Sequence, residues 1–196
     1  MIVDAAQPAV TGEQSPVTGE DDRRALLALA RRAIAAVATG RHDQPGPSPP
    51  GLDRSAALFV TVRVAGELRG CIGSFEPRPS LWTAVFELAI AAATRDHRFP
   101  SIAACDVEQL SIEISLLAPP RTISSPTELR PGKHGVEIRN GAHRGVLLPQ
   151  VATEHGLDTE GFLGETCRKA GLPRLAWRQP ETEIRVFEAQ IFGDRN

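Results

Sequence analysis

The chain contains no tyrosine, one methionine and only two lysines among its 196 residues. Tyrosine often acts as an acid or base in enzymes, so one kind of catalytic residue is excluded. The scarcity of lysine means that arginine carries almost all the positive charge. The three cysteines, Cys71, Cys105 and Cys167, are odd in number and far apart. This spacing makes a poor disulfide framework, suits a reducing cytosol and lacks the close cysteine or histidine pairs of a zinc site.

A strong net charge and long apolar runs are absent as well. The formal net charge is −2, which argues against a nucleic-acid-binding protein, because such proteins carry a basic excess. No segment approaches the length that spans a bilayer, and the N-terminus lacks the basic and apolar segments of a signal peptide. We therefore expect a soluble cytoplasmic protein with no membrane partner, and nothing indicates a metal or an organic cofactor.

The pattern along the chain predicts a tail and one domain. Residues 1–20 are rich in Gly, Pro, Thr and acids, so we expect them to be disordered, and residues 21–196 have the size of one domain. Periodicity and turn signals predict helices at 21–39, 81–94 and about 159–170, and strands at 58–64, 67–72, 110–117, 135–139, 142–148 and 185–192. Hairpins beside helices, without regular βαβ alternation, indicate an α+β fold with a mostly antiparallel sheet.

The most informative segment is the run Leu68-Arg69-Gly70-Cys71-Ile72-Gly73. It places a thiol between two glycines, two residues after an arginine, on a predicted strand. Glycines let a ligand approach the backbone closely. A nearby guanidinium favours the thiolate, which is the reactive form of cysteine. The run is therefore typical of a functional site rather than of a filler strand.

The exposure of Cys71 depends on the hairpin before it. A two-residue turn at 65–66 pairs Cys71 with Val60 on an apolar face, where the thiol is a small buried residue. A three-residue turn at 65–67 pairs Cys71 with Thr61 on a mixed face instead. In either register, simple alternation places Arg69 on the same face as Cys71. The sequence leaves both registers open.

Four further polar residues are candidates for the site. Asp96 and Arg98 follow helix 81–94 and could bind a substrate or tie the helix end through an ion pair. Glu113 lies on the polar face of strand 110–117, where it could act as an acid or pair with an arginine. His134 precedes a glycine in a loop-like setting and is the best candidate base, although a histidine that caps a loop fits the same pattern.

The run at 68–73 resembles the signature of the AMMECR domain family, called AmmeMemoRadiSam system protein A in prokaryotes. Further motifs continue the resemblance in order along the chain: Asp96-x-Arg98-Phe99-Pro100, Ile112-Glu113-Ile114-Ser115, His134-Gly135, Leu148-Pro149-Gln150-Val151 and Cys167-x-Lys169-Ala170-Gly171-Leu172. The resemblance covers roughly residues 22–193, and the ordered motifs make it specific. One departure is Ala65-Gly66, where relatives often carry Asn-Gly.

The resemblance implies an α+β fold of a larger and a smaller lobe, with the cysteine motif near a cleft between them. It also implies a prokaryotic setting beside a Memo-like protein and a radical S-adenosylmethionine protein. It supplies no agreed reaction, because the family has no settled biochemical activity, and fold analogy cannot fill that gap.

Two classes of function remain open. In the first, the protein is an enzyme or a component of an enzyme system, with Cys71 as nucleophile or thiol ligand and with His134 and Glu113 as candidate acids or bases. The ligand-binding candidates for its cleft are Arg69, Gly70, Gly73, Asp96 and Arg98. In the second, the same motif forms a non-catalytic binding or assembly module that recognises a small molecule, a peptide or the neighbouring proteins.

Overall fold

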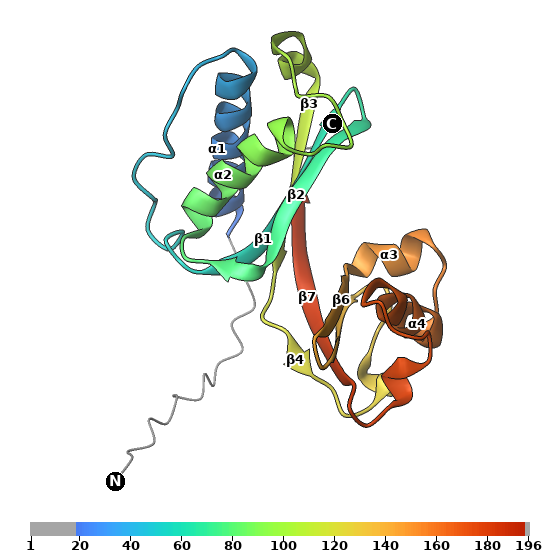
Figure 1. Cartoon of the computed structure of the whole chain (residues 1–196). Coiled ribbons are helices and arrows are strands. Elements are labelled where there is room, and N and C mark those ends of the chain that lie inside the picture. The colour runs from blue at the N-terminus through green and yellow to red at the C-terminus, as the bar shows by residue number, and fades with distance from the viewer. Residues whose placement is uncertain (1–18, 195–196) are drawn as a thin grey trace.

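The computed structural model describes residues 19–194 (Figure 1). Residues 1–18 of the predicted tail lie outside the described residues, and Glu20 already belongs to the first helix. The helices and strands in chain order are α1 (Glu20–Ala38), β1 (Ala56–Val64), β2 (Glu67–Arg78), α2 (Leu81–Thr94), β3 (Leu110–Leu117), β4 (Arg121–Thr122), β5 (His134–Asn140), β6 (His143–Leu147), α3 (Pro149–Glu154), α4 (Thr159–Lys169) and β7 (Glu183–Gly193). Short 3₁₀ turns η1 (Ala104–Gln109), η2 (Pro126–Glu128) and η3 (Ala176–Arg178) complete the described elements.

One curled antiparallel sheet connects the two lobes. Its strand order is β2-β1-β3-β7-β5-β6, and β4 pairs with β7. Strand β7 pairs with β3 in the larger lobe and with β5 in the smaller lobe, so it belongs to both. Figure 1 shows α1 and α2 over the first lobe and α3 and α4 over the second. The predicted α+β class with an antiparallel sheet is confirmed.

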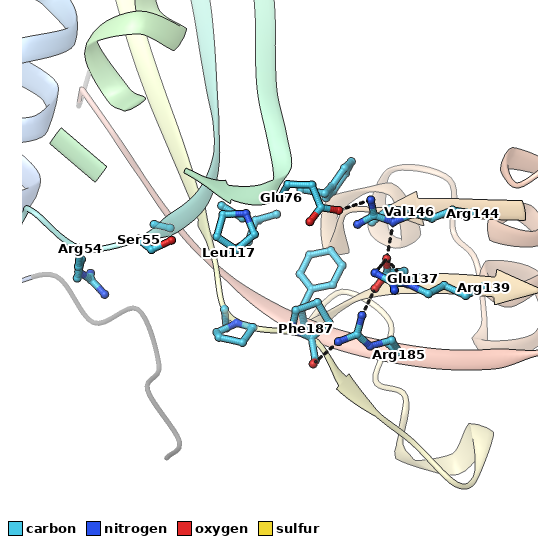
Figure 2. Close-up of a pocket in the computed structure, with 17 residues that line it drawn as sticks. Arg54, Ser55, Glu76, Leu117, Glu137, Arg139, Arg144, Val146, Arg185 and Phe187 are labelled. Atoms are coloured by element: carbon cyan, nitrogen blue, oxygen red, sulfur yellow. Dashed lines mark hydrogen bonds and ion pairs between the residues drawn. The ribbon is translucent and has the colours of Figure 1, made fainter. Parts of the chain in front are cut away.

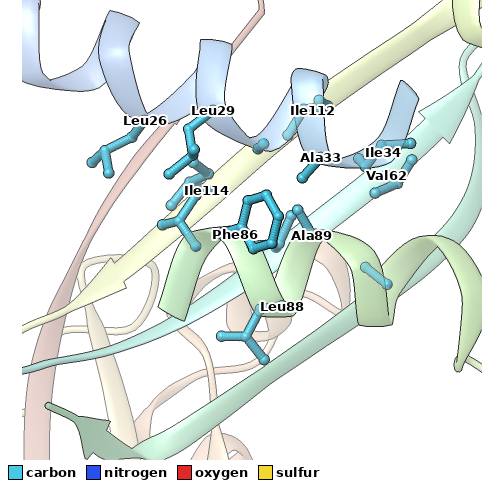
Figure 3. Close-up of a cluster of buried hydrophobic side chains, with 14 of the residues drawn as sticks. Leu26, Leu29, Ala33, Ile34, Val62, Phe86, Leu88, Ala89, Ile112 and Ile114 are labelled. Atoms are coloured by element: carbon cyan, nitrogen blue, oxygen red, sulfur yellow. The ribbon is translucent and has the colours of Figure 1, made fainter. Parts of the chain in front are cut away.

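The main core lies between the first lobe's strands and its two helices. Val62 of β1 and Ile112 and Ile114 of β3 are buried against Leu26 of α1 and Phe86 of α2 (Figure 3). Each fully buried aliphatic side chain of this kind contributes about 1.5–3 kcal/mol. As the sequence predicts, α2 spans Leu81–Thr94, with the Ser80 hydroxyl accepting the Thr83 N–H at its start.

The other side of the sheet is named the inner face here, and it carries the odd-numbered residues of β1, β3 and β7. Pairing places Phe59 of β1, Ser115 of β3 and Ile191 of β7 in one row across this face. Near the second lobe the inner face is covered by a small apolar cluster that contains Ala57 and Phe187. Toward the β1–β2 hairpin it becomes more exposed, as Arg63 and Glu113 show.

The β1–β2 hairpin settles the register that the sequence leaves open. The turn has two residues, Ala65 and Gly66, and both have positive φ angles, 50° and 84°. A register shift between Val62 and Arg63 then leaves one extra residue on β2, so Cys71 pairs with Thr61. A β-bulge is such a one-residue insertion. The structure thus combines the two-residue turn of the first alternative with the Cys71–Thr61 pairing that was expected for a three-residue turn. Neither alternative was right as a whole.

Several elements differ from the sequence-based predictions. Strand β2 continues past residue 72, where its predicted range ends, to Arg78, and it includes Pro77. This is possible because β2 is at the sheet edge, where a missing N–H costs no ladder bond. Helix α3 and strand β4 were not predicted, being only six and two residues long. Within residues 19–194, no helix is both long and apolar enough to cross a membrane.

Candidate functional site

Cys71 lies in a row of three side chains on the inner face. It pairs with Thr61, which on its other side pairs with Glu113. Directly paired residues of an antiparallel sheet point to the same face. The Thr61 hydroxyl donates a hydrogen bond to the Cys71 sulfur, with Oγ1 and Sγ 3.3 Å apart. Cys71 is partly exposed and Glu113 is exposed, so a ligand can reach this row from solvent.

The backbone of Cys71 is held from the loop that follows α2. The Cys71 N–H donates to Oδ2 of Asp96 at 2.9 Å, and Nη2 of Arg98 donates to the Cys71 carbonyl at 3.5 Å. Both backbone groups therefore point away from β1, and their partners close an open sheet edge that would otherwise remain unpaired. This arrangement also makes Cys71 and Thr61 a non-hydrogen-bonded pair, the kind in which side chains approach most closely.

Asp96 is a structural anchor in this arrangement. Its side chain is 7% exposed, and it accepts the Cys71 N–H together with the backbone and guanidinium N–H groups of Arg98. The hydrogen bond from Arg98 holds the pKa of the Asp96 carboxyl well below its usual range. Arg98 is 61% exposed on its outer side. The sequence allowed Asp96 and Arg98 either to bind a substrate or to form an ion pair, and the ion pair is present. It holds the strand that carries Cys71.

Arg69 is the extra residue of the β2 bulge, because Leu68 pairs with Arg63 and Gly70 with Val62. The alternation that predicted Arg69 beside Cys71 is therefore interrupted. Its Nη2 lies 3.6 Å from Oδ2 of Asp106 in η1. Its Nε is buried without a hydrogen-bond partner among the described residues. Arg69 is thus anchored to η1, and its ion-pair partner is a carboxylate rather than the thiol.

Packing accounts for the two glycines of the motif. A Cβ on Gly70 would lie 1.9 Å from the carbonyl oxygen of Ala92 in α2. A Cβ on Gly73 would lie 2.4 Å from the ring of Phe59. Protein atoms therefore fill the space beside both residues, where the sequence suggested room for a ligand.

His134 lies on the opposite face of the sheet from Cys71. It is buried at the start of β5 and pairs with Glu188, an even-numbered residue of β7. Its Nδ1 accepts the Arg130 N–H at 3.2 Å, and its Nε2 is 3.8 Å from a Glu188 carboxylate oxygen. Burial lowers the pKa of His134 and outweighs the nearby Glu188 carboxylate. The structure thus brings Glu113, and not His134, into the row of Cys71.

The other two cysteines have different environments. Cys167 is fully buried in the core of the second lobe, and burial raises the pKa of its thiol. Cys105 is exposed in η1. The described residues contain no cluster of three His, Cys, Asp or Glu side chains arranged to hold a metal ion.

A cavity of about 280 Å³ lies farther along the inner face, where the two lobes meet (Figure 2). Its walls include Ala57, Phe75 and Phe187, together with charged side chains of β5, β6 and β7. Cys71 is not among the lining residues. Ala57 and Thr61 are four residues apart on β1, which corresponds to about 13 Å of strand. The cavity and the Cys71 row are therefore separate parts of one face.

Sequence reasoning did not find this cavity. Three strands of the smaller lobe contribute its charged residues Glu137, Arg139, Arg144 and Arg185, and Glu76 of β2 and Arg54 complete the charged lining. One signal was present: charged residues alternate with apolar ones in strand 135–139, on the face away from the second lobe's core. That the three strands converge on one point could be known only from their pairing.

Fold and site together define a two-lobed α+β protein on a curled antiparallel sheet, with a partly exposed thiol on its inner face. The chain belongs to the AMMECR1 family, whose model matches residues 27–192. This confirms the resemblance seen in the sequence.

Three archaeal proteins illustrate the similarity. A protein of Methanothermobacter thermautotrophicus is 42% identical over 182 residues, covering 89% of this chain and 95% of its own. A protein of Pyrococcus furiosus is 42% identical over 181 residues, covering 86% of each chain. The crystal structure of an uncharacterised protein from Pyrococcus horikoshii superposes with a TM-score of 0.76 at 38% identity, covering 87% of this chain and 90% of that one.

Proposed function

We propose that this AMMECR1-family protein is a cytosolic enzyme, or a component of an enzyme system, whose substrate lies on the inner face against Cys71. The observation that carries the proposal is the row Cys71–Thr61–Glu113. It combines a partly exposed thiol, a hydroxyl in hydrogen-bond contact with the sulfur and an exposed carboxylate. Covalent catalysis generally uses a nucleophile together with nearby groups that accept its proton. In this row the hydroxyl and the carboxylate are those groups.

Each member of the row has a distinct role in this proposal. For this step the Thr61 hydroxyl rotates so that its oxygen accepts the hydrogen of the Cys71 S–H group. The S–H bond breaks, its proton moves to the Thr61 oxygen while the hydroxyl gives its own proton to the Glu113 carboxylate, and the sulfur bonds to an electrophilic carbon of the substrate. The electron pair displaced from that carbon moves onto the oxygen bonded to it. Thr61 is needed as the link, because two strand spacings of about 4.8 Å separate the outer members of the row. Asp96 and Arg98 are positioning residues, since they hold the Cys71 backbone.

The protein partners in this proposal are a Memo-like protein and a radical S-adenosylmethionine protein. Their support is the sequence resemblance to the AmmeMemoRadiSam system. A pull-down with both proteins, comparing the wild type with Cys71→Ser, separates docking from chemistry. Unchanged binding together with lost cellular function supports chemistry at the thiol.

A non-catalytic binding module is the second candidate, and one observation favours it. Ile191 is 40% exposed on the inner face, in the row of Phe59 and Ser115, which is next to the row of Cys71. An exposed apolar side chain beside a partly buried ring is suited to contact a peptide or a protein. In this case Ile191→Ser weakens the pull-down, whereas Cys71→Ser does not.

Alkylation by iodoacetamide, followed residue by residue with mass spectrometry, tests the catalytic proposal. Cys105 is the internal reference, because it is also accessible but lies outside the row. We expect Thr61→Val and Glu113→Gln to slow the alkylation of Cys71 by about threefold or more and to leave Cys105 unchanged. We also expect a metabolite fraction to protect Cys71 selectively. Equal rates at Cys71 in all three proteins, with no protection by any fraction, would rule the proposal out.

A further inference from the structure

We infer that the cavity between the lobes binds a small organic anion. This anion has a carboxylate or phosphate head attached to a flat apolar body. The inference goes beyond the role proposed for Cys71, which does not line this cavity. It rests on three arginines gathered at one buried carboxylate, on their unused hydrogen-bond donors and on the aromatic wall that faces them.

The charged wall is organised around Glu137. This side chain is 1% exposed and lies within ion-pair distance of the guanidinium groups of Arg139, Arg144 and Arg185 (Figure 2). Oε1 accepts from Arg139 and Arg144, and Oε2 accepts from Arg185 at 2.9 Å. Burial alone opposes ionisation, but the hydrogen bonds from Arg144 and Arg139 prevail and lower the pKa of Glu137. Glu137 is therefore an internal counterion that fixes the positions of three cations.

The cavity lining carries more positive than negative charge, because its arginines outnumber its two carboxylates. Arg139 and Arg144 are directly opposite each other across the β5–β6 hairpin. Like charges in such a pair are unfavourable, so an arrangement of this kind needs compensation. Glu137 and Glu76, the latter paired with Arg144, are the two carboxylates in the lining. Outside the lining, a carboxylate oxygen of Glu183 lies 3.9 Å from Nε of Arg185. Arg54 adds another positive charge to the lining. A bound anion would supply the missing compensation.

The unused donors match an oxyanion. Each guanidinium has five N–H donors in a planar fork, and this fork fits a carboxylate or a phosphate in two-pronged fashion. Hydrogen bonds within the described residues engage at most two nitrogens of any one of the three. Arg139 is 42% exposed and Arg144 is 36% exposed, so donors remain available to a ligand.

The apolar wall that faces the arginines indicates the chemistry of the remainder of the ligand. Phe75 and Phe187 line the cavity with ring centroids 6.4 Å apart, and Leu117 extends this apolar surface. Val146, which pairs with Glu137, adds an apolar side chain on the side of the arginines. Figure 2 shows Phe187 and Leu117 on the side of the cavity toward the first lobe and the arginines on the side of the second. At about 280 Å³ the cavity is at the small end of ligand sites. It therefore fits a compact ligand with a single anionic head.

The test uses calorimetric titration of the full chain with phenyl phosphate, benzoate and neutral benzyl alcohol. We expect at least one of the two anions to bind with a Kd of about 1 mM or below, more weakly at high salt, and benzyl alcohol to show no saturable binding. In NMR spectra, the methyl signals of Leu117 and Val146 should shift with the anion, whereas those of Leu26 in the other core should not. The preferred head group identifies whether a carboxylate or a phosphate is the natural ligand.

Variants separate this site from general electrostatics and from Cys71. Arg139→Gln leaves Glu137 with two arginines, so the protein should still fold, and binding should weaken about tenfold or more. Arg168→Gln is the matched control, since Arg168 is 70% exposed and forms an ion pair with Glu165, away from the cavity. Arg168→Gln and Cys71→Ser should bind like the wild type. Absence of saturable binding by either anion to about 10 mM, or equal binding by Arg139→Gln and the wild type, would overturn the inference.

Discussion

The carboxylate of Asp96 accepts the backbone N–H of Cys71 across 2.9 Å, so a residue from the loop after α2 closes the open edge of β2. Arg98 completes the contact by donating to the Cys71 carbonyl while pairing with Asp96. Two motifs that are 25 residues apart in the sequence thus form one unit. Its consequence is that the thiol is held on a rigid strand and not on a flexible edge.

Replacing Asp96 with asparagine should destabilise the protein by about 1–3 kcal/mol, because a nearly buried acceptor loses its charge and its bond with Arg98. The control is Asp21→Asn, which removes an exposed pair with Arg24 and should cost less than about 0.5 kcal/mol. Urea unfolding at neutral pH measures both. A similar small effect in the two variants would contradict the anchoring role.

The Asp96 carboxylate also makes the free energy of unfolding depend on pH. Because the pKa of Asp96 is lower in the folded than in the unfolded protein, the unfolded state binds more protons as the solution becomes acidic. The stabilisation by Asp96 is therefore complete above about pH 4 and is lost as the pH falls below that value. The difference in unfolding free energy between the wild type and Asp96→Asn should shrink between about pH 5 and pH 2. A constant difference over this range would be evidence against the ionised contact.

Ala65 holds a positive φ of 50° in the turn between β1 and β2. A residue with a Cβ is disfavoured in this conformation, and asparagine tolerates it better. We therefore expect Ala65→Asn to stabilise the protein by about 0.5–1 kcal/mol, seen as a higher Tm. Ala65→Val should have the opposite effect, since a β-branched residue is least suited to this region. Stabilisation by valine would show that the turn differs from this geometry.

Gly70 contacts α2 so closely that no side chain fits. Because a Cβ there would lie 1.9 Å from the Ala92 carbonyl, Gly70→Ala should cost more than about 2 kcal/mol. Gly19→Ala is the comparison, since nothing lies within 4 Å of its Cβ position, and only a capping effect below about 1 kcal/mol is expected. Thermal unfolding of the two variants distinguishes packing from a general intolerance of substitution at glycine.

Burial of His134 makes the second lobe sensitive to mild acid. Its pKa is lower when folded, so the unfolded state binds the proton first as the pH falls below about 6.5, and stability decreases. His134→Asn keeps an acceptor for the Arg130 N–H without this protonation. It should therefore lose less stability than the wild type between about pH 7.5 and 5.5. The exposed His155→Asn variant should behave like the wild type.

Local sequence was sufficient for the elements with strong periodicity and clear ends. The ranges predicted for α2 and β3 match the structure, because α2 has the Ser80 cap and β3 alternates from Leu110 to Leu117. The six-residue α3 is too short for a periodic signal, and its start is marked only by Pro149. The predicted range of β2 was too short because a proline such as Pro77 is compatible with an edge strand but not with a central one, and only the sheet order shows that β2 lies at the edge.

The site was only partly predictable. The motif identified Cys71, and alternation along 110–117 placed Glu113 on a polar face, but their alignment through Thr61 depends on a bulge that no local signal marked. His134 was a candidate because of its residue type and its motif. The sheet register places it on the other face.

The sequence by itself determined the family, the α+β class, the helical and strand periodicities and the choice of Cys71 as the residue to test. These depend on local spacing and residue type, which the chain carries without folding. The tertiary structure alone decided that Thr61 meets the thiol, that Asp96 secures its strand and that three arginines converge on Glu137. Such contacts join residues far apart in the chain, and their geometry exists only once bulge, strand order and sheet curvature have fixed which side chains share a face.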